Sequence, residues 1–104
     1  MIELPHKSAA VWQRFFSENR SLVHRYIVRQ IKKAIQQDQS KVCLFVFKGT
    51  SDATWIYRKN YLFMLEEALK TFIKEEAYED AQQVKLIIDQ FYINKLIEET
   101  SSEA

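Results

Sequence analysis

The chain has 104 residues, of which 47% are hydrophobic and 28% are charged, and its formal net charge at pH 7 is +1. This size and apolar content fit a single folded domain over residues 1–104 and exclude a largely disordered chain. No apolar run reaches the ~18 to 20 residues that span a bilayer, and the N-terminus lacks a signal-peptide pattern, so we expect a cytoplasmic protein that makes no membrane contact.

Helices should dominate the structure, because the chain has one Gly and one Pro, the two residues that most often interrupt regular structure. In the N-terminal part, apolar residues recur every three or four positions, which predicts a helix over 9–17 and another over 20–37. The polar segment SENRS between them fits either two helices or one kinked continuous helix.

A β-hairpin is predicted in the middle of the chain, over about 42–58. The run VCLFVF is β-branched and aromatic, the segment KGTSD that follows it is a strong turn signal, and ATWIYR supplies a second strand. The first strand is apolar on both alternating faces, whereas one layer of helices covers only one face. We therefore expect a second copy of the chain to cover the other face or an unpaired strand edge, which predicts a homodimer.

The C-terminal part predicts an antiparallel helical pair over about 61–97. Apolar residues keep helical spacing over this whole range, but one helix of that length is too long for so small a domain. The break should coincide with a cluster of four carboxylates: Glu75, Glu76, Glu79 and Asp80. These would repel one another in mid-helix but are favoured in the first turn of a new helix, so we place the break near Glu76 and Ala77. The polar tail from about 99 to 104 should fray. The fold class expected overall is α+β, mainly helical.

The segment LEEALKTFIKEEAYEDAQQVKLIIDQF, residues 65–91, resembles the UVR motif, a helical hairpin of bacterial excision-nuclease B and C proteins, Clp-family ATPases and their adaptors. The matching positions are Leu65, Leu69, Glu76, Tyr78, Glu79, Ala81, Val84, Lys85 and Ile88. The chain departs from the motif at Lys85, where the family usually has Arg, and at Leu86, which replaces a frequent Asp.

In that family the hairpin docks other proteins. The resemblance therefore implies a non-enzymatic protein-interaction module of a bacterial cytoplasm, with a protein partner whose identity the sequence does not give. The contact residues that it implies are Tyr78, Glu79, Ala81 and Lys85. The alternative is that these residues close an internal helix pair, for which the small side chain of Ala81 is well suited.

A second candidate surface is basic. The first 50 residues hold nine Lys or Arg against three Asp or Glu, and the predicted helix over 20–37 gathers four of these cations on one side: Arg25, Arg29, Lys32 and Lys33. A row of cations at helical spacing can follow the phosphates of a nucleic acid. Nucleic-acid binding is therefore the alternative function, ranked second because the whole chain is close to neutral.

Catalysis is not indicated by the sequence. His6 and His24 have no nucleophile or carboxylate placed beside them, and Cys43 is alone in an apolar strand, where it resembles an inert core residue. The chain has no motif for binding nucleotide phosphates and no Cys/His spacing for a metal. We predict a protein that is not an enzyme and has no cofactor or metal.

Overall fold

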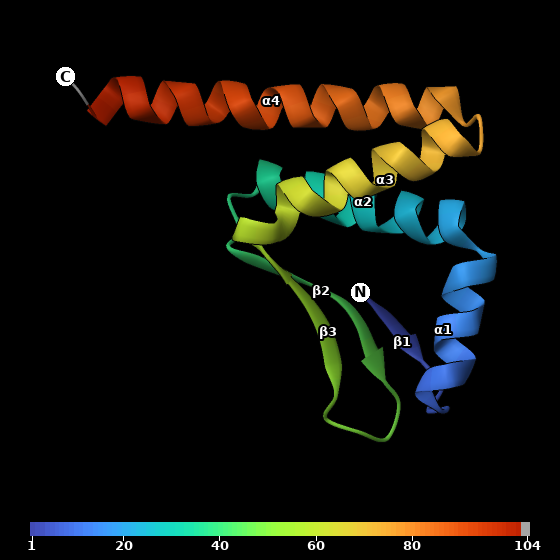
Figure 1. The fold of residues 1–104 in the computed structure, drawn as a ribbon. Helices are drawn as coiled ribbons and strands as arrows, with labels where there is room; N and C mark the ends of the chain where they lie inside the picture. Colours follow the sequence, from blue (N-terminus) through green and yellow to red (C-terminus); the bar gives the residue numbers. More distant parts are fainter. Residues whose placement is uncertain (103–104) are drawn as a thin grey trace.

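The computed structural model describes residues 1–102 and confirms an α+β, mainly helical fold, with four helices and a three-stranded sheet in this part of the chain (Figure 1). In chain order the elements are β1 (Ile2–Leu4), α1 (Ala9–Glu18), α2 (Arg20–Gln36), β2 (Lys41–Phe47), β3 (Ala53–Tyr57), a 3-10 turn η1 (Arg58–Asn60), α3 (Tyr61–Lys74) and α4 (Tyr78–Ser102). Helices α2, α3 and α4 lie side by side, and the strands extend away from them (Figure 1).

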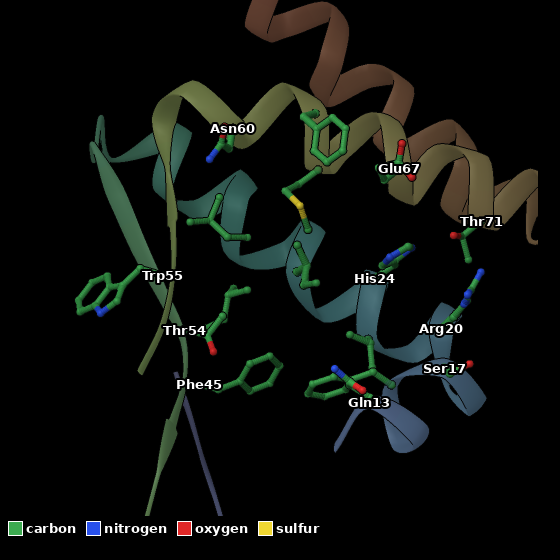
Figure 2. A pocket seen from close by; sticks show the side chains of 17 residues that line it. Gln13, Ser17, Arg20, His24, Phe45, Thr54, Trp55, Asn60, Glu67 and Thr71 are labelled. Carbon is green, nitrogen blue, oxygen red and sulfur yellow. The ribbon is translucent and has the colours of Figure 1, made fainter. Parts of the chain in front are cut away.

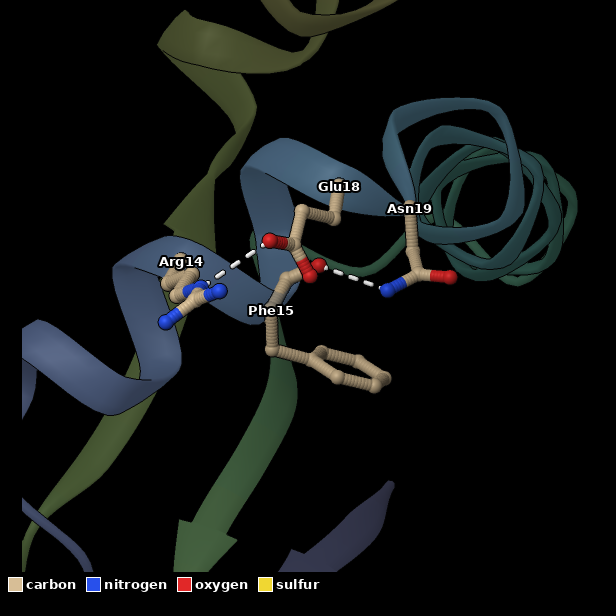
Figure 3. A network of polar contacts seen from close by, with 4 residues as sticks. All are labelled: Arg14, Phe15, Glu18 and Asn19. Carbon is tan, nitrogen blue, oxygen red and sulfur yellow. Dashed lines mark hydrogen bonds and ion pairs between the residues drawn. The ribbon is translucent and has the colours of Figure 1, made fainter.

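The first two helices are separate and meet at a sharp angle, which resolves the two alternatives for this region (Figure 1). The side-chain amide of Asn19 donates to the Phe15 carbonyl in the last turn of α1, at 2.8 Å (Figure 3). The backbone carbonyl of Asn19 accepts from the Val23 N–H at 3.0 Å, in the first turn of α2. One residue thus satisfies exposed backbone groups of both helices. An ion pair between Arg14 and Glu18 lies beside this junction (Figure 3).

The sheet has the order β1-β2-β3. The predicted hairpin is present, since β2 and β3 pair antiparallel, but strand β1 pairs parallel to β2 and was not predicted. Cys43 pairs with Trp55 and Phe45 with Thr54, so Leu44 is an extra residue that forms a β-bulge. The bulge allows two consecutive side chains, Leu44 and Phe45, to be buried.

The helices pack on one face of the sheet. On that face, the ring of Phe45 lies 5.5 Å from that of Phe16 on α1 and 5.4 Å from that of Tyr26 on α2. The hydroxyl of Tyr26 donates to the Leu44 carbonyl at 2.7 Å, which fixes α2 to the bulge. The pairing register places four side chains together on the opposite, outer face: Lys41, Cys43, Trp55 and Tyr57.

The core lies between α2, α3, α4 and the near end of the sheet. Its largest fully buried side chains are Ile31, Tyr61, Leu65, Phe72 and Val84. The hydroxyl of Tyr61 donates to the Gln39 carbonyl at 3.0 Å, so this buried phenol is satisfied. Helices α3 and α4 therefore share one core with the rest of the fold and do not form a separate unit.

The break between α3 and α4 falls where the carboxylate cluster predicted it. Glu76 has a left-handed backbone, with φ of +58°. The Glu76 N–H donates to the Ile73 carbonyl at 3.1 Å, and the Ala77 N–H to the Phe72 carbonyl at 2.7 Å, which is the Schellman pattern of a helix end. At the other end, α4 continues to Ser102, past the predicted start of the frayed tail at about 99, and residues 103–104 lie outside the described part.

We expect Glu76→Gly to stabilise the protein by roughly 0.5–1 kcal/mol, because a left-handed backbone costs a residue with a Cβ atom more than it costs Gly. Glu75→Gly is the matched control, since Glu75 has φ of −92° and gains nothing from Gly. Urea denaturation of both variants measures the difference. Equal destabilisation by the two substitutions would contradict this account of the turn.

Candidate protein-docking surface

The side of helix α4 that meets the core changes from apolar to polar along the length of the helix. Val84, Ile88 and Phe91 follow one another at helical spacing on the side that meets the core, where Val84 is fully buried and the other two are partly buried. The next two positions of that same line are Lys95 and Glu98, which are exposed. The core-facing side of α4 is therefore apolar up to about residue 91 and polar beyond it.

The apolar residues of the C-terminal part lie on other sides of the helix. We call four of them the distal stripe, namely Tyr92, Ile93, Leu96 and Ile97, and they are between 46 and 64% exposed. This part of α4 extends beyond α2 and α3 (Figure 1). From the sequence we expected the apolar residues of this helix to stay on nearly the same side to about Ile97. That expectation is wrong, because the apolar residues lie on a different side of the helix after Phe91. A helical wheel restricted to residues 89–100 would have shown it.

The four residues implied by the UVR resemblance separate into two groups. Tyr78, Glu79 and Lys85 are exposed near the α3–α4 turn. Ala81 is only 8% exposed and belongs to the core. The expectation that Ala81 contacts a partner is therefore wrong, because its small side chain closes the helix pair, which was the alternative reading.

The predicted basic stripe is interrupted by an ion pair. The guanidinium of Arg25 binds the carboxylate of Asp80 with two hydrogen bonds, of 3.1 Å and 2.7 Å. Arg25 thereby holds the pKa of the Asp80 carboxyl below its ordinary value. Arg29 and Lys32 border the same hollow between α2 and α4, whereas Lys33 borders a different hollow beside β2. Three of the four cations thus border one hollow, and the charge of one of them, Arg25, is offset in part by Asp80.

We expect the Arg25–Asp80 pair to contribute about 0.2–1 kcal/mol, because both side chains keep contact with solvent and surface pairs are weak. A double-mutant cycle with Arg25→Ala and Asp80→Ala measures this coupling by urea denaturation. The Arg14–Glu18 pair, more exposed and within one helix, is the control and should give a smaller value. A coupling energy that is larger for Arg14–Glu18 than for Arg25–Asp80 would contradict a role for Asp80 in holding α4 to α2.

A groove of about 850 Å³ opens between α1, α2, α3 and the helix-facing side of the sheet (Figure 2). Its floor is apolar and includes Phe16, Phe45 and Ile56. Polar side chains line its other end: Arg20, His24, Glu67 and Thr71 (Figure 2). The Glu67 carboxylate accepts from Lys70 at 3.2 Å and so is used within its own helix. The groove is an apolar hollow with a polar end.

His24 should make stability depend on pH. Burial and then the charge of Arg20 lower its pKa below 6.5, against the opposing charges of Glu67 and Glu75. The unfolded chain then takes up a proton that the folded chain resists, so stability should be full above the unfolded pKa and fall as pH drops from about 7 to 5. Urea denaturation of His24→Gln over this range should give a flatter profile. His6→Gln, at the exposed second histidine, should keep the wild-type slope, and a flat wild-type profile would contradict the assignment.

Comparisons with known proteins give no relative: no protein-family model, no curated protein and no solved structure matches the chain. Within residues 1–102, no group of three or more His, Cys, Asp or Glu side chains is placed to hold a metal ion. None of the helices in that range is both long and apolar enough to cross a membrane.

Proposed function

We propose that the protein is a non-enzymatic protein-interaction module that docks through the distal stripe of α4. The observation that carries this proposal is the change of phase after Phe91, which places the four apolar side chains of the stripe in solvent on a helix that extends beyond the core (Figure 1). A contiguous exposed apolar surface of this kind is typical of a contact site.

The occupant that we propose for the stripe is a second copy of the chain. Two copies of α4 that pack antiparallel about a two-fold axis bring the same residues of both subunits together, as an isologous contact requires. Ile93 and Leu96 are three residues apart and so suit the two apolar positions of a coiled-coil seam. This moves the expected dimer contact from the hairpin to α4. Tyr78, Glu79 and Lys85 then remain free near the turn for a different protein, as the UVR resemblance implies.

Light scattering from low to high micromolar concentration tests the dimer. The wild type should be a dimer, and Leu96→Glu with Ile97→Glu should be a monomer with unchanged helical circular dichroism. Asn94→Glu, a new charge on the same segment but off the stripe, should remain a dimer. A monomeric wild type, or a dimer that survives the stripe substitutions, would exclude this contact.

The docking role near the turn needs its own experiment. Tyr78→Ala and Lys85→Glu, used as baits in the native host's lysate, should lose a partner that the wild type and Gln36→Glu both retain. Retention of the same partners by all four baits would contradict a role for the turn region.

A further inference from the structure

The outer face of the sheet carries two exposed aromatic rings on one strand. Trp55 and Tyr57 are 44 and 50% exposed, and because they are two residues apart on β3 they project from the same face. Thr54, the residue before Trp55, projects to the opposite side of β3 (Figure 2). Two residues of a strand span roughly 7 Å, so each ring can stack on a separate planar group.

Cations and amides border the Trp55 ring, and two of them, Gln30 and Lys33, come from helix α2. A hollow of about 320 Å³ is lined by Trp55 together with Met1, Lys33, Lys41, Val42, Cys43 and three glutamines, Gln30, Gln37 and Gln39. The ammonium of Lys41 lies 4.7 Å from the centroid of the Trp55 ring, and Lys41 also pairs with Tyr57 across the hairpin. No carboxylate is among the described residues that line this hollow. Its charge is therefore positive.

Two acidic groups lie near this hollow. Asp38 is bound to Arg58, and Glu3, on β1 opposite Val46, lies on the outer face beyond the Cys43–Trp55 pair, outside the hollow itself. The face thus combines stacking rings, cations and neutral amides, which is the combination that recognises bases and phosphates of an unpaired strand.

We propose that this outer face binds single-stranded nucleic acid. Trp55 and Tyr57 stack on neighbouring bases, Lys33 and Lys41 contact the phosphates between them, and the glutamine amides reach base edges. This function goes beyond protein docking and uses a surface away from the distal stripe. Of the predicted basic stripe it uses only Lys33.

The test measures the fluorescence of Trp55. The chain has two tryptophans, so in Trp12→Phe the fluorescence reports on Trp55 alone, and anisotropy of a labelled oligonucleotide repeats the titration with the wild type. Oligo(dT) and oligo(U) in low salt should quench Trp55, and their affinity should fall as salt rises. Tyr57→Ala should weaken binding by about 10-fold or more, as expected for one lost stacking contact, and Lys41→Gln should reduce the salt dependence.

Phe63→Ala removes an exposed aromatic ring from α3 and Arg29→Gln removes a cation outside this face, so both should bind like the wild type. A duplex of the same length should bind more weakly than the single strands. Absence of quenching and of anisotropy change in low salt, or equal binding by Tyr57→Ala and Phe63→Ala, would overturn the proposal. If Trp55→Ala converted a dimer to a monomer, a second copy of the chain would cover this face. That result would also overturn the proposal of nucleic-acid binding.

Discussion

Ala81→Glu should lower the melting temperature by well over 10 °C. Ala81 lies in the core between α3 and α4, and an unpartnered carboxylate buried there costs several kcal/mol. In a domain of this size each kcal/mol shifts the melting temperature by roughly 4–8 °C. Thermal unfolding followed by circular dichroism measures the change.

Gln82→Glu is the matched control for this substitution. It adds the same charge one residue further along α4, at an exposed position, and should change the melting temperature by only a degree or two. If Ala81→Glu melted within about 1 °C of the wild type, a shift far below that expected for one kcal/mol, the close packing of α3 on α4 would be disproved.

Phe72→Ala should remove most of the stability of the protein. Phe72 is fully buried where α2, α3 and α4 meet, and its carbonyl accepts the hydrogen bond that ends α3. Truncating a buried Phe costs about 3–5 kcal/mol, against a total of about 5–15 kcal/mol for a typical protein. The midpoint of urea denaturation should fall steeply, and a partly unfolded population should be visible without denaturant.

The neighbouring Ile73 provides the comparison, because its side chain is exposed and Ile73→Ala should cost less than about 1 kcal/mol. The ring of His24 lies edge-on to Phe72, with centroids 6.5 Å apart. Loss of Phe72 should therefore admit water to His24 and weaken the pH dependence of stability. A Phe72→Ala protein as stable as Ile73→Ala would show that the three helices do not share this core.

Local patterns predicted most of the elements correctly. Helical spacing located α2 and α3, the β-branched run and turn signal located the β2–β3 hairpin, and the helix dipole placed the break near Glu76. Each of these depends on residues close together in sequence, for which local physical chemistry is sufficient. The exposed Tyr78, Glu79 and Lys85 were also identified as candidates from such a pattern.

Long-range contacts explain what was missed. The three residues of β1 carry no strand signal of their own and become a strand by pairing with β2. Asp80 was interpreted through the helix dipole alone, whereas its guanidinium partner, Arg25, lies on a helix far away in the chain. The distal stripe was missed because an average over all of α4 hides a change of phase within it.

The parallel pairing of β1 sets an order on folding. Ile2 pairs with Phe45, and helices α1 and α2 lie between them in the sequence, so β1 is synthesised before its ladder partner and stays unpaired until β2 has emerged. The β2–β3 hairpin closes a far shorter loop and has the lower entropic barrier. We expect pulsed hydrogen exchange to show protection of β2 and β3 before β1, and simultaneous protection would contradict this order. The N-terminal strand then completes the sheet instead of nucleating it.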